Sequence, residues 1–343
     1  MLNFCTLFDI NYINHGLTMY ESLKRHCEDF HLYVFAFCDK SYNLLKKLNL
    51  EKVTVISLKE FEDEELLKVK PTRSKGEYCW TCTSSTILYC LKNFNLENCT
   101  YLDADLYFYD NPKILIDEME ANQKTVLITE HRYTPRHDAS KTSGKYCVQF
   151  MTFKNEPKAL EVLNWWRNSC IEWCYARYED GKFGDQKYLD DWLTRFDCIH
   201  SLENLGGGVG PWNIQQYDFK QKNQKIYLIK KSDKSKTPVI FFHMEVVKVQ
   251  SDGFIANDRP DLYDIPYKYG KLFYKNYMKS LIKTNTELRK ISPDLTEVKM
   301  PKPNFKAQKR QLRRWLFSCS FSKSHPYLRI LGYYLIKPND LGW

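Results

Sequence analysis

The sequence predicts an α/β fold, with a mostly parallel sheet covered by helices on both faces and a basic helical extension at its C-terminal end. Short apolar runs alternate with amphipathic stretches through the first half of the chain, which is the pattern of strands joined by helices. At 343 residues, of which 43% are hydrophobic, the chain is long enough to bury a sizeable core. We expect a sheet-containing region over residues 1–265 and a basic, aromatic-rich helical region over 266–343.

The expected elements of the first half follow one another in strand–helix order. A mostly parallel sheet built this way binds ligands outside the carboxyl ends of its strands. The strands are expected at residues 4–8, 32–37, 52–56, 100–102 and 126–129, and the helices at 16–26, 42–48, 61–67 and 82–93.

The second half is less regular. We expect a strand at residues 146–153, helices at 157–175 and 185–196, and a buried strand at 239–242 that ends before His243. A glycine run at 206–210 precedes Pro211, Trp212 and Asn213.

Positive charge is concentrated at the end of the chain. Residues 268–343 carry 17 Lys and Arg against 4 Asp and Glu, whereas the first 267 residues carry 34 against 38. No apolar stretch is long enough for a membrane-spanning helix, and the N-terminus does not have the pattern of a signal peptide. We therefore expect a cytoplasmic protein whose twelve cysteines are mostly buried free thiols. Cys79 and Cys82 are closely spaced, but no second ligand pair accompanies them, so no zinc or redox site is expected.

Asp103 and Asp105 carry the strongest chemical signal. They follow an apolar strand directly, at spacing i, i+2, so both carboxylates can converge where the chain leaves the sheet. Carboxylates suit hard cations such as Mg²⁺ or Mn²⁺, which in turn neutralise a diphosphate. The alternative is an ordinary turn with two solvated aspartates.

The sequence resembles nucleotide-sugar glycosyltransferases of the GT-A type in two places. The first is residues 4–12, followed by Gly16, Leu17 and 20–23, and the second is the Asp103–Asp105 motif. The resemblance is greatest to the family-8-like bacterial enzymes of lipopolysaccharide and capsule synthesis, and it spans about residues 3–250. It implies a Rossmann-like GT-A sheet whose first strand leads into a nucleotide-binding loop. Within that segment, which includes Thr6 and Phe8, Asp9 would contact the base, Asn11 the ribose or phosphates, and Tyr12 would stack on the base. A capping role for Asp9 and a core-covering role for Tyr12 remain alternatives.

Three further segments match this family in the expected order: residues 144–150, residues 184–189 and residues 241–243. Residues 144–150, including Gln149, would line the sugar pocket, although Cys147 stands where the family usually has Asn. Asp185 and Gln186 resemble the Asp-Gln pair that opens a helix near the reacting carbon, or they are ordinary helix caps.

The resemblance also implies a third metal ligand and the remaining residues that contact the donor. His243 would be the third metal ligand beside Asp103 and Asp105, unless it is a core histidine, and Lys248 would approach the diphosphate. The family's Arg before the motif strand is missing here, so Arg73 or Lys75 would take its place. Ala104 would contact the nucleotide sugar between the two aspartates.

The implied activity is metal-dependent transfer of a sugar from a nucleotide-diphosphate donor, with a UDP-sugar expected, to a hydroxyl of a surface or lipid-linked glycan. Asp185 and Gln186 favour retention of configuration; under an inverting reaction Glu130 would be the base on the acceptor side. Two other functions stay open, a nucleotide-sugar-binding protein without turnover and a membrane scaffold acting through its C-terminal region.

The C-terminal region predicts a membrane contact. Residues 305–317 would form a basic amphipathic helix that lies on an anionic membrane, here the inner face of the cell membrane, or packs on the body. The tyrosines and phenylalanine between Tyr263 and Tyr277 would serve at that interface or pack on the body. No nucleic-acid-binding motif accompanies the charge, so nucleic acid is not expected as a partner.

Overall fold

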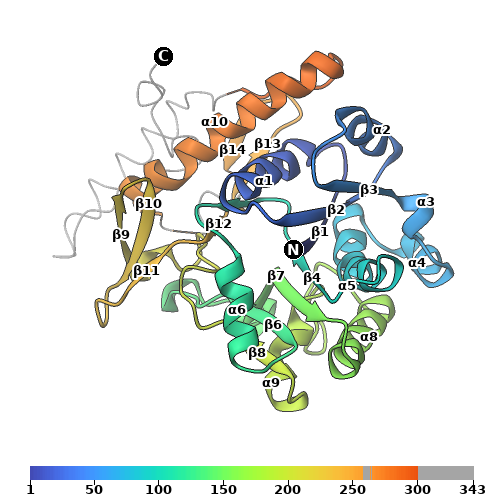
Figure 1. Cartoon of the computed structure of the whole chain (residues 1–343), viewed down its shortest axis with the longest axis horizontal. Coiled ribbons are helices and arrows are strands. Elements are labelled where there is room, and N and C mark those ends of the chain that lie inside the picture. The colour runs from blue at the N-terminus through green and yellow to red at the C-terminus, as the bar shows by residue number, and fades with distance from the viewer. Residues whose placement is uncertain (258–262, 264, 300–343) are drawn as a thin grey trace.

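The computed structural model describes residues 1–257, 263 and 265–299 of the chain (Figure 1). Its centre is a seven-stranded sheet with the strand order β3-β2-β1-β4-β7-β6-β8. All neighbouring strands are parallel except that β7 is antiparallel to β4 and β6. The strands are β1 (Leu2–Phe8), β2 (Phe30–Ala36), β3 (Val53–Ser57), β4 (Asn98–Leu102), β6 (Val126–Glu130), β7 (Tyr146–Lys154) and β8 (Ile199–Ser201). The α/β class with a mostly parallel sheet is therefore confirmed.

Helices cover both faces of the sheet because side chains alternate along each strand. Cys5 and Leu7 of β1 belong to one core, and Phe4 and Phe8 belong to the other. The first core is covered by α3 (Leu58–Phe61), α4 (Glu64–Val69), α5 (Lys75–Asn93), α8 (Pro157–Glu172) and α9 (Trp192–Arg195). The second core is covered by α1 (Ile13–His26), α2 (Asp39–Leu48) and α6 (Lys113–Ala121).

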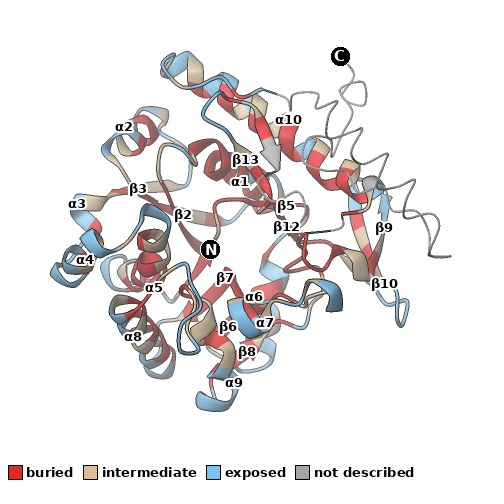
Figure 2. Ribbon diagram, turned by 180° about the vertical axis from the view of Figure 1, so that it is seen from behind, coloured by how far each residue is buried: buried red, intermediate tan, exposed pale blue. Residues whose placement is uncertain are grey.

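A third core joins the end of the described chain to the sheet region. It contains four aromatic residues of α10 (Tyr267–Ile291), namely Tyr269, Phe273, Tyr274 and Tyr277, together with residues of the short strands. Figure 2 shows buried residues recurring along α10. The short strands are β5 (Leu106–Phe108) paired with β12 (Phe241–His243), β9 (Tyr217–Lys222), β10 (Lys225–Lys230) and β11 (Lys236–Pro238) in one sheet, and β13 (Val247–Val249) paired with β14 (Ile255–Asn257).

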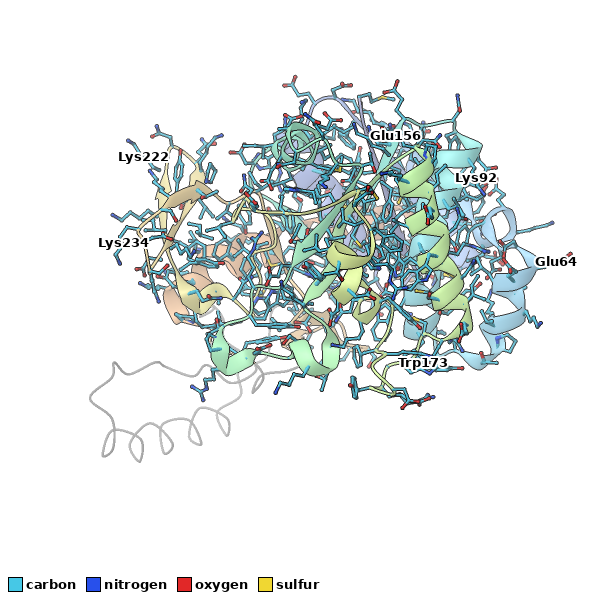
Figure 3. The ribbon with its side chains drawn as sticks, turned by 90° about the horizontal axis from the view of Figure 1, so that it is seen from below. Glu64, Lys92, Glu156, Trp173, Lys222 and Lys234 are labelled. Carbon is cyan, nitrogen blue, oxygen red and sulfur yellow. The ribbon has the colours of Figure 1, made fainter. Side chains whose placement is uncertain are left out.

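The sheet of β9, β10 and β11 projects from the body. Figure 3 labels Lys222 and Lys234 at this end of the molecule, opposite Glu64 of α4. Its inner side chains, among them Ile226 and Leu228, are buried in the third core, so this sheet is attached to the body by apolar contacts.

Several expected elements have different bounds in the structure. Residues 61–67 do not form one helix: α3 ends at Phe61, and α4 begins at Glu64 after Asp63, whose carboxylate accepts from the Leu66 amide. The helix expected at 185–196 is instead a 3-10 turn, Lys187–Asp191, followed by the short α9. The remaining short helices are α7 (Ser140–Ser143) and the 3-10 turns Lys70–Thr72, Pro135–His137 and Ile214–Gln216.

The described part of the C-terminal region is α10 and the segment after it. The aromatic residues of α10 named above pack on the body, which was one of the two alternatives for them. The division of the chain at residue 265 remains a prediction, and the helix expected at 305–317 lies outside the described residues. Within the described residues, no helix combines the length and apolar character needed to cross a membrane.

The cysteines in the described part of the chain are free, as expected. Eleven free cysteines occur in the described part of the chain, and among them Cys38 and Cys79 alone are partly exposed. Cys79 and Cys82 both lie on α5, where burial raises the pKa of the Cys79 thiol to about 12.

Candidate functional site

Asp103 and Asp105 lie at the carboxyl end of β4, as the sequence predicts. The chain makes a tight turn there: the Leu106 amide donates to the Asp103 carbonyl at 3.2 Å before β5 begins. The Asp103 amide donates to the Gln149 carbonyl at 3.0 Å, and the Met244 amide donates to the Asp105 carbonyl at 2.9 Å. The turn is thus held from both sides, by β7 and by the residue that follows β12.

His243 joins the two aspartates from a distant part of the sequence. Antiparallel pairing of β12 with β5 places His243 opposite Leu106. Its Nε2 lies 3.0 Å from Asp105 Oδ1 and 3.8 Å from Asp103 Oδ2. The three predicted metal ligands therefore converge in the structure.

Gln149 fixes the direction in which the His243 ring faces. Its Oε1 lies 3.0 Å from His243 Nδ1, and an amide oxygen can only accept, so Nδ1 carries the proton. In the neutral imidazole, the Nε2 lone pair would then face the two carboxylates, where a bound cation could use it; this is how metal-binding histidines are usually oriented. Gln149 was expected to line the sugar pocket; the structure adds this contact with the imidazole.

The residues around His243 suit a hard divalent cation. Asp103, His243 and Cys147 each offer a ligand atom within 4.8 Å of the others. Burial raises the pKa of the Cys147 thiol to about 11, so the sulfur stays protonated and is a poor ligand near neutral pH. Two carboxylates and one imidazole remain, a set that fits Mn²⁺ or Mg²⁺.

The two aspartates differ in charge state. Burial, with the Asp105 carboxylate close by, raises the pKa of Asp103 to about 7. Asp105 is buried as well, but the charge on His243 outweighs this and holds the pKa of Asp105 well below its usual value. In return, and against the effect of its own burial, Asp105 holds the pKa of His243 well above its usual value. A bound cation would replace the proton that this pair shares.

Tyr12 and Lys248 border the carboxylates. The Tyr12 hydroxyl donates to Asp105 Oδ2 at 3.1 Å, and Lys248 Nζ donates to the same hydroxyl at 2.5 Å. Both residues are partly exposed, and the Lys248 ammonium also lies 4.9 Å from the centre of the Tyr12 ring. These two predicted donor-binding residues are therefore brought next to the predicted metal ligands.

Asp9 and Asn11 shape the loop between β1 and α1. Asp9 accepts from the Asn11 amide at 2.9 Å and from Asn11 Nδ2 at 2.8 Å, and it also accepts from the Tyr12 amide at 3.3 Å. This is the turn-capping arrangement that the sequence left open as an alternative. Asn11 is exposed and Asp9 partly so, and their contacts with a nucleotide stay a prediction.

Thr6, Phe8 and Ala104 are buried in the body of the protein. Phe8 packs against Gly16 so closely that a Cβ on Gly16 would lie 2.3 Å from the Phe8 ring. Thr6 is fully buried, and its hydroxyl has no hydrogen-bond partner among the described residues. Whether these side chains contact a donor stays a prediction.

Asp185 is buried within electrostatic range of Asp103, whereas Gln186 is held by a backbone carbonyl. Burial, together with the nearby Asp103 charge, raises the pKa of Asp185 to about 7, so this carboxyl lies within electrostatic reach of the metal ligands. Gln186 Nε2 donates to the Ser143 carbonyl at 2.5 Å. The pair does not open a helix as expected, because the 3-10 turn begins only at Lys187.

Glu130 and Arg73 also have partners away from the carboxylates. Glu130 ends β6 and lies 3.9 Å from the ammonium of Lys145. Arg73 donates to the Ile171 carbonyl at 3.1 Å near the end of α8, and its guanidinium lies 4.0 Å from the centre of the Tyr175 ring. Lys75 is exposed in the first turn of α5.

Three residues near the site were not predicted from the sequence. His15 stacks on Tyr12, with ring centres 4.4 Å apart, and its Nδ1 lies 2.6 Å from the Tyr277 hydroxyl. Trp212 meets the His243 ring edge-on at 5.3 Å. His15 follows Tyr12 by one helical turn, which was a usable signal, but nothing local in the sequence relates Tyr277 or Trp212 to the aspartates.

The comparisons with known proteins give distant relatives. No family model matches the chain. The uncharacterized protein YfnD of Bacillus subtilis strain 168 is 29% identical over 311 residues, which covers 88% of this chain and 95% of YfnD. The uncharacterized protein YfnF of the same strain is 28% identical over 255 residues, covering 72% of this chain and 82% of YfnF.

Solved structures of glycosyltransferases are also similar, at low identity. The galactosyltransferase LgtC in complex with donor and acceptor sugar analogues has a TM-score of 0.48 and 11% identity, covering 82% of this chain and 95% of LgtC. Mouse xyloside xylosyltransferase 1 has a TM-score of 0.41 and 15% identity, covering 59% of this chain and 84% of the mouse chain. GlyE of Streptococcus pneumoniae TIGR4 has a TM-score of 0.39 and 15% identity, covering 59% of this chain and 45% of GlyE.

Proposed function

We propose that this protein is a metal-dependent glycosyltransferase that moves a sugar from a nucleoside-diphosphate sugar, with a UDP-sugar expected, to a hydroxyl of a surface glycan such as lipopolysaccharide or capsule. One observation carries the proposal. Asp103, Asp105 and His243 come from segments about 140 residues apart and converge at the carboxyl end of β4, with the imidazole oriented by Gln149. The sequence resemblance supplies the reaction class.

Asp103, Asp105 and His243 would hold Mn²⁺ or Mg²⁺, whose charge neutralises the diphosphate of the donor. Lys248, beside Asp105, would add a second positive charge for the diphosphate. Tyr12, Asp9 and Asn11 would hold the nucleoside from the loop after β1. Preorganised charge of this kind is the largest contribution in many enzymes that stabilise a leaving group.

In the reaction, the bond between the anomeric carbon and the diphosphate oxygen breaks, and the acceptor oxygen bonds to that carbon. With retention of configuration, which we favour, the acceptor attacks from the side of the leaving group. The acceptor proton then passes to the departing phosphate oxygen, and no separate base is required. Asp185 would face the sugar near the reacting carbon, whereas under inversion Glu130 would accept the proton.

We further propose that the protein works at the inner face of the cell membrane on a lipid-linked or surface glycan. This rests on the excess of Lys and Arg over residues 268–343, which would attract anionic lipids.

A panel of nucleotide sugars with Mn²⁺ or Mg²⁺ tests the proposal, using wild type, Asp105→Ala and Asp110→Asn. Asp110 is a matched control because its partly buried carboxylate pairs with Lys225 at 2.6 Å and has no contact with the predicted ligands in the structure. We expect metal-dependent release of nucleoside diphosphate from one donor by wild type and Asp110→Asn, and loss of that release in Asp105→Ala. If wild type neither binds nor hydrolyses any donor, the enzyme proposal is wrong.

A further inference from the structure

Helix α10 contacts α1 through hydrogen bonds as well as through apolar side chains. The Tyr277 hydroxyl and His15 Nδ1 are 2.6 Å apart, and both residues are almost fully buried. Farther along the same contact, Asn285 Nδ2 donates to Asn14 Oδ1 at 3.2 Å, in a buried position. Because hydrogen bonds are directional, these pairs fix how α10 lies on the start of α1.

His15 contacts both Tyr277 of α10 and Tyr12 of the candidate site. It follows Tyr12, the N-cap residue of α1, by three residues, and their rings stack with an angle of 23° between the planes. The Tyr12 hydroxyl donates to Asp105. A continuous series of contacts therefore runs from Tyr277 through His15 and Tyr12 to a predicted metal ligand.

The charge states of this series suit a lasting contact. Burial lowers the pKa of His15 to about 4, although Asp105 opposes this, and Lys248 lowers it further. Burial also holds the pKa of Tyr277 well above its usual value. A neutral imidazole nitrogen and a protonated phenol form a good hydrogen bond, and neither group changes its charge near neutral pH.

We propose that His15 and Tyr277 are positioning residues for the donor: they hold the Tyr12 ring in place, so that α10 is a working part of the donor-binding site. The inference rests on the proposed function, because it requires a nucleoside diphosphate to bind beside Tyr12 and Asp105.

The position of Tyr12 explains why holding its ring in place would raise affinity for the donor. Tyr12 precedes the first residue of α1, follows the exposed Asn11 and is itself partly exposed, so its side chain is not fully enclosed by the protein. Stacking on a buried ring that is itself bonded to α10 limits the rotamers that Tyr12 can adopt. A binding group held in one conformation loses less entropy when its ligand arrives, which raises affinity.

The test compares Tyr277→Phe with Tyr274→Phe. Each change removes one buried hydroxyl from α10, but the Tyr274 hydroxyl has no hydrogen-bond partner among the described residues. We would measure dissociation constants for UDP, GDP, CDP, ADP and TDP with Mn²⁺, and kcat and KM for hydrolysis of the preferred donor. We expect Tyr277→Phe to weaken binding by about fivefold, the loss of one typical buried hydrogen bond. Tyr274→Phe should stay within about twofold of wild type, and kcat should be unchanged in both.

A double-mutant cycle supplies a second readout. His15→Phe keeps a ring against Tyr12 but removes the bond to Tyr277, so adding Tyr277→Phe to it should weaken nucleotide binding little further. Equal nucleotide affinity in wild type and Tyr277→Phe, with both folded by thermal unfolding, would overturn the inference alone. Wild type that binds no nucleoside diphosphate with Mn²⁺ would overturn the proposed function, and the inference with it.

Discussion

The two sides of the candidate site differ in what their side chains contact. On the metal side, Asp103, Asp105, His243 and Gln149 contact one another across segments that are far apart in sequence. On the other side, which we call the reaction side and which includes Arg73 although it was predicted to contact the nucleotide, Gln186, Arg73 and Glu130 contact backbone carbonyls or a surface lysine instead.

This difference teaches what a motif can and cannot predict. A short motif fixes where the backbone passes, because strand ends and turns follow local sequence. The partner of a long side chain is decided by whatever the fold brings nearby. Asp103 and Asp105 are short carboxylates at a fixed turn, whereas Gln186 and Arg73 have long side chains that can reach several partners.

The largest effect is expected on the metal side, from His243→Ala. The change removes one ligand and leaves two buried carboxylates near each other without the imidazole, so a divalent cation should bind poorly. Metal-dependent donor hydrolysis should fall by about 100- to 1,000-fold, the size typical of losing one electrostatic contact to a developing charge.

His31→Gln is the control for this change, because His31 lies on β2 and its Nε2 contacts the Thr54 hydroxyl at 2.8 Å. Unchanged hydrolysis in His243→Ala would show that the imidazole is a core residue rather than a ligand.

A smaller effect, on metal affinity, is expected when Gln149→Ala is compared with Gln186→Ala, which tests the difference between the two sides directly. Gln149 orients the His243 ring, and loss of such a contact usually lowers metal affinity by about 10- to 100-fold. Gln186 donates to the Ser143 carbonyl, so Gln186→Ala should leave metal affinity unchanged. Titration with Mn²⁺, followed by electron paramagnetic resonance, measures both. Equal affinity in the two variants would contradict the role assigned to Gln149.

The sheet could be predicted from the sequence because its signals are local. The run that became β1 is mostly apolar and ends before the polar Asp9, and the apolar end of β4 likewise stops before Asp103. The expectation of one helix at 61–67 failed because Glu62 and Asp63 interrupt it, Glu62 ending α3 and Asp63 capping α4. The helix expected from Asp185 was wrong because the chain makes a 3-10 turn after Gln186 instead.

The predicted metal ligands could be found from the sequence, but the contact between His15 and Tyr277 could not. Asp103, Asp105 and His243 each end or follow a short apolar run, so their places at strand ends were visible. The contact between His15 and Tyr277 spans 262 positions and depends on how α10 packs against α1. No periodicity within either segment encodes that packing, so only the fold shows it.

From the raised pKa of Asp185 we expect the free energy of unfolding to depend on pH. In the metal-free protein, burial beside Asp103 raises the pKa of Asp185 to about 7, well above the usual value of an aspartate in an unfolded chain. The folded state therefore binds more protons than the unfolded state between about pH 4 and 7. By linkage, this carboxyl lowers stability progressively as the pH rises through that window.

Asp185→Asn removes this contribution. Its unfolding temperature should exceed that of the wild type at pH 8 by on the order of a few degrees, and match it near pH 4. Thermal unfolding followed by circular dichroism, with a chelator present, measures the difference. A variant that is less stable than wild type at pH 8 would mean that Asp185 is ionised and stabilising in the folded protein.

The smallest effect on donor binding is expected from Arg73→Ala. Its guanidinium donates to the Ile171 carbonyl and lies over the Tyr175 ring, so the change should weaken the contact between the start of α5 and the end of α8. We expect a loss of about 1 kcal/mol in the free energy of unfolding, typical of one hydrogen bond, measured by urea denaturation. The KM for the donor should stay within about twofold of wild type, a difference of about 0.4 kcal/mol. A tenfold rise in the donor KM with normal stability would instead place Arg73 at the nucleotide, the role that the sequence predicts for it.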